Sequence, residues 1–80
     1  MRLPRGLTGA ELIRQLEKLG YRVSRQSGSH VRLTCDSPVQ HHVTIPNHDP
    51  LRIGTLSAIL ADVATHHHVS REELLQRLFG

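Results

Sequence analysis

Hydrophobic and polar positions alternate in two short runs, over residues 21–26 and residues 30–35. A turn rich in glycine and serine separates them. Period-two alternation on both sides of such a turn predicts a β-hairpin. Successive side chains of a strand point to opposite faces, so half of the second run faces the core and half faces away from it. The inward set is Val31, Leu33 and Cys35, and the outward set is His30, Arg32 and Thr34.

A third alternating run covers residues 41–45 and follows a break that contains proline. Because the connection over residues 36–40 is short, the second and third strands are expected to be antiparallel neighbours. The outward positions of the third strand, His42 and Thr44, are predicted to share the outer face with His30. Its inward positions are His41, Val43 and Ile45.

The segment before the hairpin has the signals of a helix. Thr8 and Glu11 have the spacing of a capping box, in which each side chain accepts a hydrogen bond from the backbone N–H of the other residue. Apolar residues then recur at helical spacing, and Gly20 follows where a left-handed residue ends a helix. These signals predict a helix over residues 9–19.

Two further helices are predicted in the second half of the chain. Asp49-Pro50 suits the cap and first position of a helix that runs to about residue 64. Gly54 would then lie inside this helix, at a cost of about 1 kcal/mol relative to alanine. Close approach of another backbone or of a ligand phosphate would explain this glycine, and so would a later helix start. A second capping box, Ser70-Arg71-Glu72-Glu73, opens the last helix.

The order α-β-β-β-α-α predicts an α+β fold, with a three-stranded antiparallel sheet that is covered by helices on one face. The 80 residues are expected to form one domain, 1–80, with residues 1–7 as a loose basic lead-in. Only two side chains are aromatic, so the core must be aliphatic. The candidate core residues are Leu12, Ile13, Leu16, Leu19, Val23, Val31, Leu33, Val43, Ile45, Ile53, Leu56, Ile59, Leu60 and Val63.

The charge balance favours an anionic partner. Ten lysine and arginine residues face seven acidic ones, for a formal net charge of +3, and nine of the ten are arginine. The planar guanidinium fork suits phosphate. Base stacking on aromatic side chains is the usual device of proteins that read single strands, and this chain offers almost none. A single-stranded RNA partner, if there is one, would therefore be held mainly through its phosphate backbone and 2′-hydroxyls, with weak sequence preference.

Several classes of protein are disfavoured. No apolar run has the length of a signal peptide or a membrane span, so a cytoplasmic location without a membrane partner is expected. Cys35 is the only cysteine; it has no partner for an internal disulfide and is expected as a small buried residue. His66, His67 and His68 are contiguous, and adjacent side chains do not converge on one ion. Neither a metal site nor a small-molecule cofactor is predicted.

Four segments resemble a known family in their order and spacing. They are Gly9 to Tyr21, the turn Arg25-Gln26-Ser27-Gly28-Ser29-His30, Ile45 to His48, and Gly54 to Leu60. Together they are similar to the HicA toxins, also called HicA-like mRNA interferases. The resemblance implies a fold like that of double-stranded-RNA-binding domains. It also implies a small ribonuclease that cleaves mRNA, halts translation and is neutralised by a HicB-type antitoxin. The catalytic histidine of the family falls on His30.

Histidine suits this reaction because RNA carries its own nucleophile, the 2′-hydroxyl. An enzyme need only remove its proton and stabilise the phosphorane, and imidazole titrates near working pH. His30 is the first candidate for this step. His48 is a second candidate, as the acid that protonates the leaving oxygen. The alternative is that His48 is an ordinary loop residue. The candidates for binding phosphate are Arg25, Gly28, Ser29, Arg32, Gly54 and Thr55.

Two other readings of the sequence stay open. A non-catalytic RNA-binding module could use the same fold and the same basic face. A degenerate toxin that survives as a partner-binding protein is the other reading, since Ser27 stands where the family often has a basic residue. The first interpretation differs from a nuclease in the effect of His30→Ala. A pure binder would lose little affinity, whereas a nuclease would lose turnover and keep binding.

Overall fold

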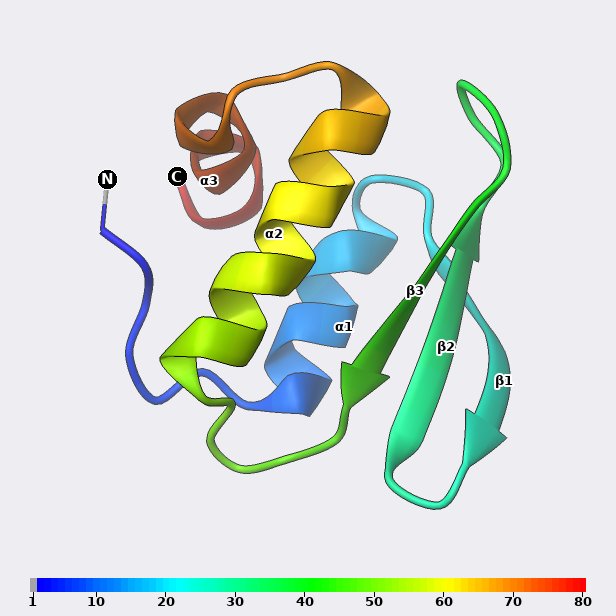
Figure 1. Ribbon diagram of the computed structural model, residues 1–80, viewed down its shortest axis with the longest axis vertical. Helices are drawn as coiled ribbons and strands as arrows, with labels where there is room; N and C mark the ends of the chain where they lie inside the picture. Colours follow the sequence, from blue (N-terminus) through cyan, green and yellow to red (C-terminus); the bar gives the residue numbers. More distant parts are fainter. Residues whose placement is uncertain (1) are drawn as a thin grey trace.

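The computed structural model describes residues 2–80, and Met1, the first residue of the expected lead-in, lies outside the described residues. Three helices and three strands follow the predicted order (Figure 1), and the α+β prediction is confirmed. The elements are α1 (Gly9–Glu17), β1 (Arg22–Ser27), β2 (His30–Cys35), β3 (His41–Pro46), α2 (Ile53–His67) and α3 (Arg71–Phe79).

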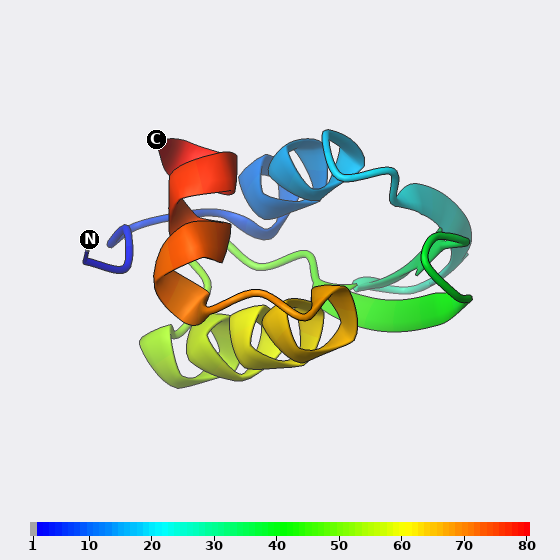
Figure 2. The ribbon, with the colours of Figure 1, turned by 90° about the horizontal axis from the view of Figure 1, so that it is seen from above.

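The sheet is antiparallel, with the strand order β1-β2-β3. All three helices lie to the same side of it in two perpendicular views (Figures 1 and 2), so the opposite face of the sheet is left open. The inward residues of β2 and β3 join the helices in one hydrophobic cluster. Its largest fully buried apolar side chains are Leu12, Leu16, Leu33, Ile45, Leu56, Leu60, Leu74, Leu75 and Val63.

The predicted capping box begins α1. The Thr8 hydroxyl accepts the Glu11 N–H at 3.1 Å, and the Glu11 carboxylate accepts the Thr8 N–H at 2.9 Å. These hydrogen bonds from Thr8 lower the pKa of the Glu11 carboxyl. The helix ends at Glu17, slightly before the predicted end, and Gly20 takes a left-handed conformation with φ of 94°.

The predicted start of α2 is wrong. The helix begins at Ile53, and Arg52 precedes it as a cap without a side-chain hydrogen bond. Leu51 is buried instead of helical, and its N–H donates to the Leu7 carbonyl at 2.8 Å. Burial of this leucine keeps the two residues that follow Pro50 out of the helix. Gly54 therefore lies in the first turn, where glycine costs less than in the middle of a helix.

Two hydrophobic residues predicted in the core are exposed. Val23 is 47% exposed and Ile53 is 45% exposed. The first lies on the free edge strand β1, which is exposed along its whole length. The second lies at the beginning of α2. Before that helix, Leu3 and Leu7 of the expected lead-in pack against the core.

The end of α2 also differs from the sequence prediction. The sequence predicted that this helix ends at about residue 64, but His66 and His67 belong to its last turn. His68 ends the helix in a left-handed conformation, with φ of 56°. The last helix, α3, begins as expected, where the Ser70 hydroxyl accepts the Glu73 N–H at 3.0 Å.

These helical histidines form a cluster with Tyr21 on the core side of the sheet. The Tyr21 hydroxyl lies 2.7 Å from His41 Nδ1 and 3.2 Å from His67 Nε2. One hydroxyl proton serves only one of these contacts, so the other imidazole must donate its N–H to the tyrosine oxygen. His41 also stacks on His66, with ring centroids 4.2 Å apart. The cluster joins β3 to the end of α2.

We expect the free energy of unfolding to fall as the pH drops below about 6.5, the ordinary pKa of histidine. Burial, followed by the nearby His66 and His41 imidazoles, lowers the pKa of His67. Arg77 and His68 add to this effect. The unfolded chain therefore binds a proton first, and the stability present above that pH is lost as the pH falls toward the lowered pKa.

Thermal melting at about pH 7.5 and about pH 5.5 measures this loss. In the variant His67→Gln the side chain at position 67 cannot bind a proton. Its melting temperature should therefore fall less over this interval than that of the unaltered protein. Glu11 does not interfere, because its contribution is lost only below its ordinary carboxyl pKa. Equal losses in the two proteins would show that His67 is not the responsible group.

Candidate active site

The hairpin turn between β1 and β2 delivers His30 to the open face at one end of the sheet. Ser27 and His30 are paired across the turn, and Gly28 has a left-handed φ of 57° that other residues adopt at a cost. The N–H groups of Gly28 and Ser29 donate to no other backbone carbonyl of residues 2–80. The turn therefore presents free donors next to an exposed imidazole.

A β-bulge in β1 decides which side chains join His30 on the open face. Val23 pairs with Leu33, and the next pair is Arg25 with Arg32, so Ser24 is an extra residue. Simple alternation would place Arg25 on the same face as Val23, toward the helices. The extra residue turns it to the open face. No pattern in the sequence marks this bulge.

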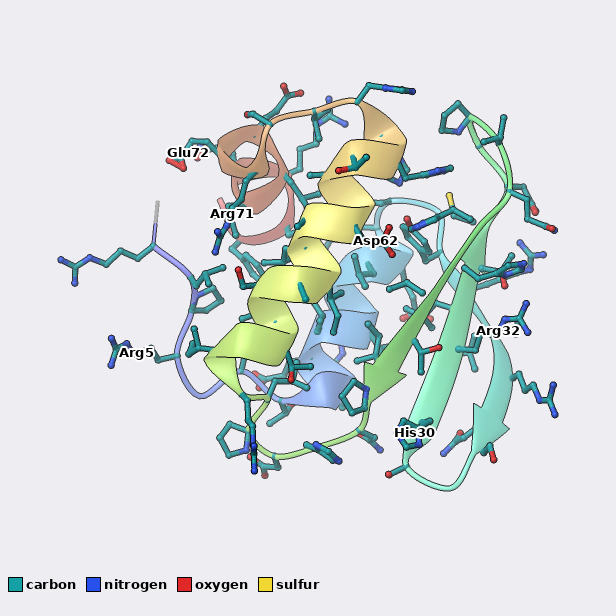
Figure 3. All side chains as sticks on the ribbon, in the orientation of Figure 1. Arg5, His30, Arg32, Asp62, Arg71 and Glu72 are labelled. Atoms are coloured by element: carbon teal, nitrogen blue, oxygen red, sulfur yellow. The ribbon has the colours of Figure 1, made fainter. Side chains whose placement is uncertain are left out.

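Cross-strand pairing arranges the open face in three rows, because directly opposed residues point to the same side. The rows are Ser27–His30–Pro46, Arg25–Arg32–Thr44 and Arg22–Thr34–His42. Figure 3 shows His30 beside the turn, and Arg32 farther along β2 and directed away from the helices. The sequence predicted the outward set of β2 correctly. It did not predict that Thr34 would be buried, at 2% exposure.

The middle row carries two arginines without an acidic partner. Arg22 is paired with Asp36 at 2.7 Å, but neither Arg25 nor Arg32 forms an ion pair within the described part of the chain. Like charges directly opposite each other destabilise a strand pair. A bound anion would relieve this repulsion. Arg5, in contrast, lies on the far side of the helices (Figure 3) and adds nothing to this face.

The loop after β3 brings His48 to the same end of the molecule. The Asn47 N–H donates to the Ser29 carbonyl at 2.6 Å, and the Gly9 N–H donates to the His48 carbonyl at 2.8 Å. The loop is thus tied to the hairpin turn on one side and to α1 on the other. The His30 and His48 side chains are both exposed, and neither makes a hydrogen bond within residues 2–80.

Gly9 is a residue of this site that sequence reasoning missed. A Cβ atom there would overlap the Pro46 carbonyl oxygen and would lie 2.8 Å from the Asn47 Cα. Only glycine lets the first turn of α1 approach the loop so closely. The contact joins residues that are far apart in the chain, so no local sequence pattern predicts it.

Gly54 and Thr55 lie apart from the other candidates, in the first turn of α2. Figures 1 and 2 place this turn on the other side of the 47–52 loop from the hairpin. A Cβ atom on Gly54 would meet nothing within 4 Å, so no packing contact requires this glycine. An open hollow beside this turn is lined by Arg2, Leu3, Arg5 and Ile53.

Two further observations concern metals and membranes. Within residues 2–80, no group of three histidine, cysteine or acidic side chains is arranged to hold a metal ion. No helix in the same part of the chain combines the length and the apolar character that crossing a membrane requires.

The arrangement of the open face suits chemistry on a phosphodiester. An exposed imidazole can exchange a proton with solvent and with a substrate. Two unpaired guanidinium groups lie in the adjacent row and can stabilise negative charge that develops on phosphate oxygens.

A comparison with known families identifies the group of proteins to which this fold belongs. The family model described as the HicA toxin of bacterial toxin–antitoxin systems matches residues 9–64, which is well over half of the chain. The match runs from the first residue of α1, through the sheet, into the last part of α2. No curated protein and no solved structure matches the chain. The match and the fold together show that the chain belongs to the HicA toxin family, whose membership in toxin–antitoxin systems implies an antitoxin partner.

Proposed function

We propose that this toxin is an endoribonuclease that cleaves mRNA by histidine acid–base catalysis, without a metal ion, and so inhibits translation. A HicB-type antitoxin would neutralise it by covering the open face of the sheet. The observation that carries the proposal is the position of His30, next to a row of two arginines that have no acidic partner. The family match supports it.

In the proposed reaction the neutral His30 imidazole removes the proton of a ribose 2′-hydroxyl. The 2′-oxygen attacks the adjacent phosphorus, and the bond to the 5′-oxygen of the next nucleotide breaks. The products are a 2′,3′-cyclic phosphate and a free 5′-hydroxyl. The acid that protonates the leaving oxygen is His48 in this scheme, since the loop that carries it is tied to the hairpin turn.

The remaining candidates bind the RNA backbone. Arg25 and Arg32 stabilise the extra charge of the phosphorane, and the free N–H groups of Gly28 and Ser29 hold a phosphate oxygen. An RNA strand that continues past the 47–52 loop would reach the first turn of α2, where Gly54-Thr55 would contact a more distant phosphate.

Cleavage of a defined RNA by the purified protein in the presence of EDTA tests the proposal. We expect cleavage to persist in EDTA and to leave 2′,3′-cyclic phosphate ends. Loss of cleavage in EDTA would rule out the metal-independent reaction. RNA that is bound but never cut would favour the alternative of a non-catalytic RNA-binding module on the same fold.

We expect the double variant Arg25→Thr, Arg32→Thr to be more stable and to bind RNA more weakly. Removing one like-charge pair across two strands should stabilise the fold by about 0.2–1 kcal/mol. If each arginine contacts one phosphate of a single strand, the salt dependence of RNA binding, log K against log salt, should lose about 1.4 from its slope.

Titrations with RNA at several salt concentrations, together with thermal melting, measure both effects. The matched control is Arg71→Thr, Arg77→Thr, which removes the same charge from α3, on the side of the molecule away from the sheet (Figure 1). If the control lowers the slope as much as the test variant does, net charge and not the arginine row determines binding.

A further inference from the structure

Thr34 is the one buried polar residue among those described, although it lies on the open face of the sheet. Its hydroxyl is 2.6 Å from Ser24 Oγ and 2.9 Å from His42 Nδ1. Ser24 is the extra residue of the bulge, and its own hydroxyl lies 3.3 Å from the Arg32 carbonyl oxygen. The bulge and the histidine of β3 therefore enclose the threonine between them.

The directions of these hydrogen bonds follow from proton counting. A carbonyl only accepts, so the Ser24 proton goes to the Arg32 oxygen, and the Thr34 proton then goes to Ser24 Oγ. Thr34 has no second proton for the imidazole, so His42 Nδ1 must carry a hydrogen and donate it. The opposite direction would satisfy only two of the three contacts, because the Arg32 carbonyl would receive no proton from Ser24.

This series of hydrogen bonds fixes the tautomer of neutral His42. With the hydrogen on Nδ1, the Nε2 atom carries a lone pair and acts only as an acceptor. The residue is exposed, and its Nε2 makes no hydrogen bond within residues 2–80. The open face therefore presents an oriented acceptor that is anchored from behind by a buried hydroxyl.

The location of this acceptor relative to His30 limits what it can bind. His42 is paired with Thr34, four residues along β2 from His30, which is a separation of about 13 Å. The two imidazoles cannot act on the same phosphate. The nearest guanidinium in its own row, Arg22, is already paired with Asp36. A neutral acceptor beside a neutralised arginine suits a hydroxyl donor better than a phosphate.

We propose that His42 Nε2 accepts a hydrogen bond from a ribose 2′-hydroxyl, on a nucleotide that flanks the one at His30. This inference rests on the proposed function, since it requires RNA to lie along the open face. A 2′-hydroxyl is the group that lets a protein distinguish RNA from DNA. His42 is thus a specificity-determining residue, and its contact is separate from the reacting 2′-hydroxyl.

Imidazole ¹⁵N NMR tests the proton chain without any RNA. At a pH where His42 is neutral, we expect the spectrum of the Nδ1–H tautomer. In Thr34→Val the acceptor is lost, and in Ser24→Ala the Thr34 proton is released toward the imidazole. Both variants should shift His42 toward the Nε2–H tautomer. An Nε2–H tautomer in the unaltered protein would overturn the proposal.

Binding of RNA with single 2′-deoxy substitutions tests the contact itself. The His30→Ala protein keeps the RNA intact during the measurement. We expect one flanking position at which loss of the 2′-hydroxyl weakens binding roughly 2- to 12-fold, the range for one hydrogen bond. In His30→Ala, His42→Phe this position should no longer matter, and the other positions should respond as before.

The two hypotheses fail in different ways. RNA binding with no flanking position that depends on His42 would overturn the hydroxyl contact and leave the nuclease proposal intact. Absence of RNA binding by the unaltered protein would overturn both. Cleavage by the His30→Ala protein would contradict the catalytic assignment alone, because the deoxy scan could then be read from uncut RNA at short times.

Discussion

Replacing His30 by alanine is expected to lower the rate of RNA cleavage roughly 10²- to 10⁴-fold, the usual contribution of a positioned acid–base group. The fold should be retained, because the imidazole is exposed and makes no hydrogen bond within residues 2–80. RNA binding should change little, since the row that contains Arg25 and Arg32 is intact. Expression of the variant should therefore not be toxic.

Single-turnover cleavage and thermal melting of the same preparation separate the two properties. The matched control is His68→Asn, which removes an exposed imidazole at the end of α2 and keeps a residue that tolerates the left-handed conformation. Its cleavage rate should equal that of the unaltered protein. A toxic and well-folded His30→Ala protein would contradict the catalytic role of His30.

Replacing Gly9 by alanine is expected to destabilise the fold by about 2–3 kcal/mol, in the upper part of the range for overpacking. The new Cβ atom would overlap the Pro46 carbonyl oxygen and crowd the Asn47 Cα, which are backbone atoms that cannot rotate away. The loop after β3 must then move away from α1. Because Asn47 also bonds to Ser29, this shift should disturb the hairpin turn and reduce cleavage as well.

Chemical denaturation measures the loss, and Gly54→Ala provides a comparison of the same chemical change. A Cβ atom at Gly54 would meet nothing within 4 Å, so alanine should stabilise this first-turn position, by at most about 0.5 kcal/mol. The two substitutions should thus have opposite signs. A Gly9→Ala protein as stable as the unaltered one would show that the loop after β3 can shift without loss of stability, and would contradict this prediction.

The sequence predicted the sheet and the hairpin turn well because their signals are local. Alternation in β2 and β3 gave both the strand positions and the inward residues, and the Thr8–Glu11 box gave the start of α1. The candidate histidine of the turn lies on the open face, as its register predicted. Its catalytic role stays a prediction.

The features that the sequence did not predict depend on contacts between distant segments. Burial of Leu51 delays the start of α2, although Asp49-Pro50 is a good local helix signal. The bulge at Ser24 turns Arg25 to the open face, and a single extra residue leaves no mark on so short a polar strand. Thr34 is buried by side chains of two neighbouring strands, and alternation describes only one strand at a time.

The loop between β3 and α2 is held at the site by main-chain atoms. Asn47 offers its N–H and His48 offers its carbonyl, while both side chains are exposed. A backbone hydrogen bond does not depend on which side chain the residue carries. The side chain at position 47 can therefore change without loss of this support, whereas the proposed role of His48 as the acid also requires its imidazole. Gly9 does not share this freedom, because every other amino acid would collide with the loop.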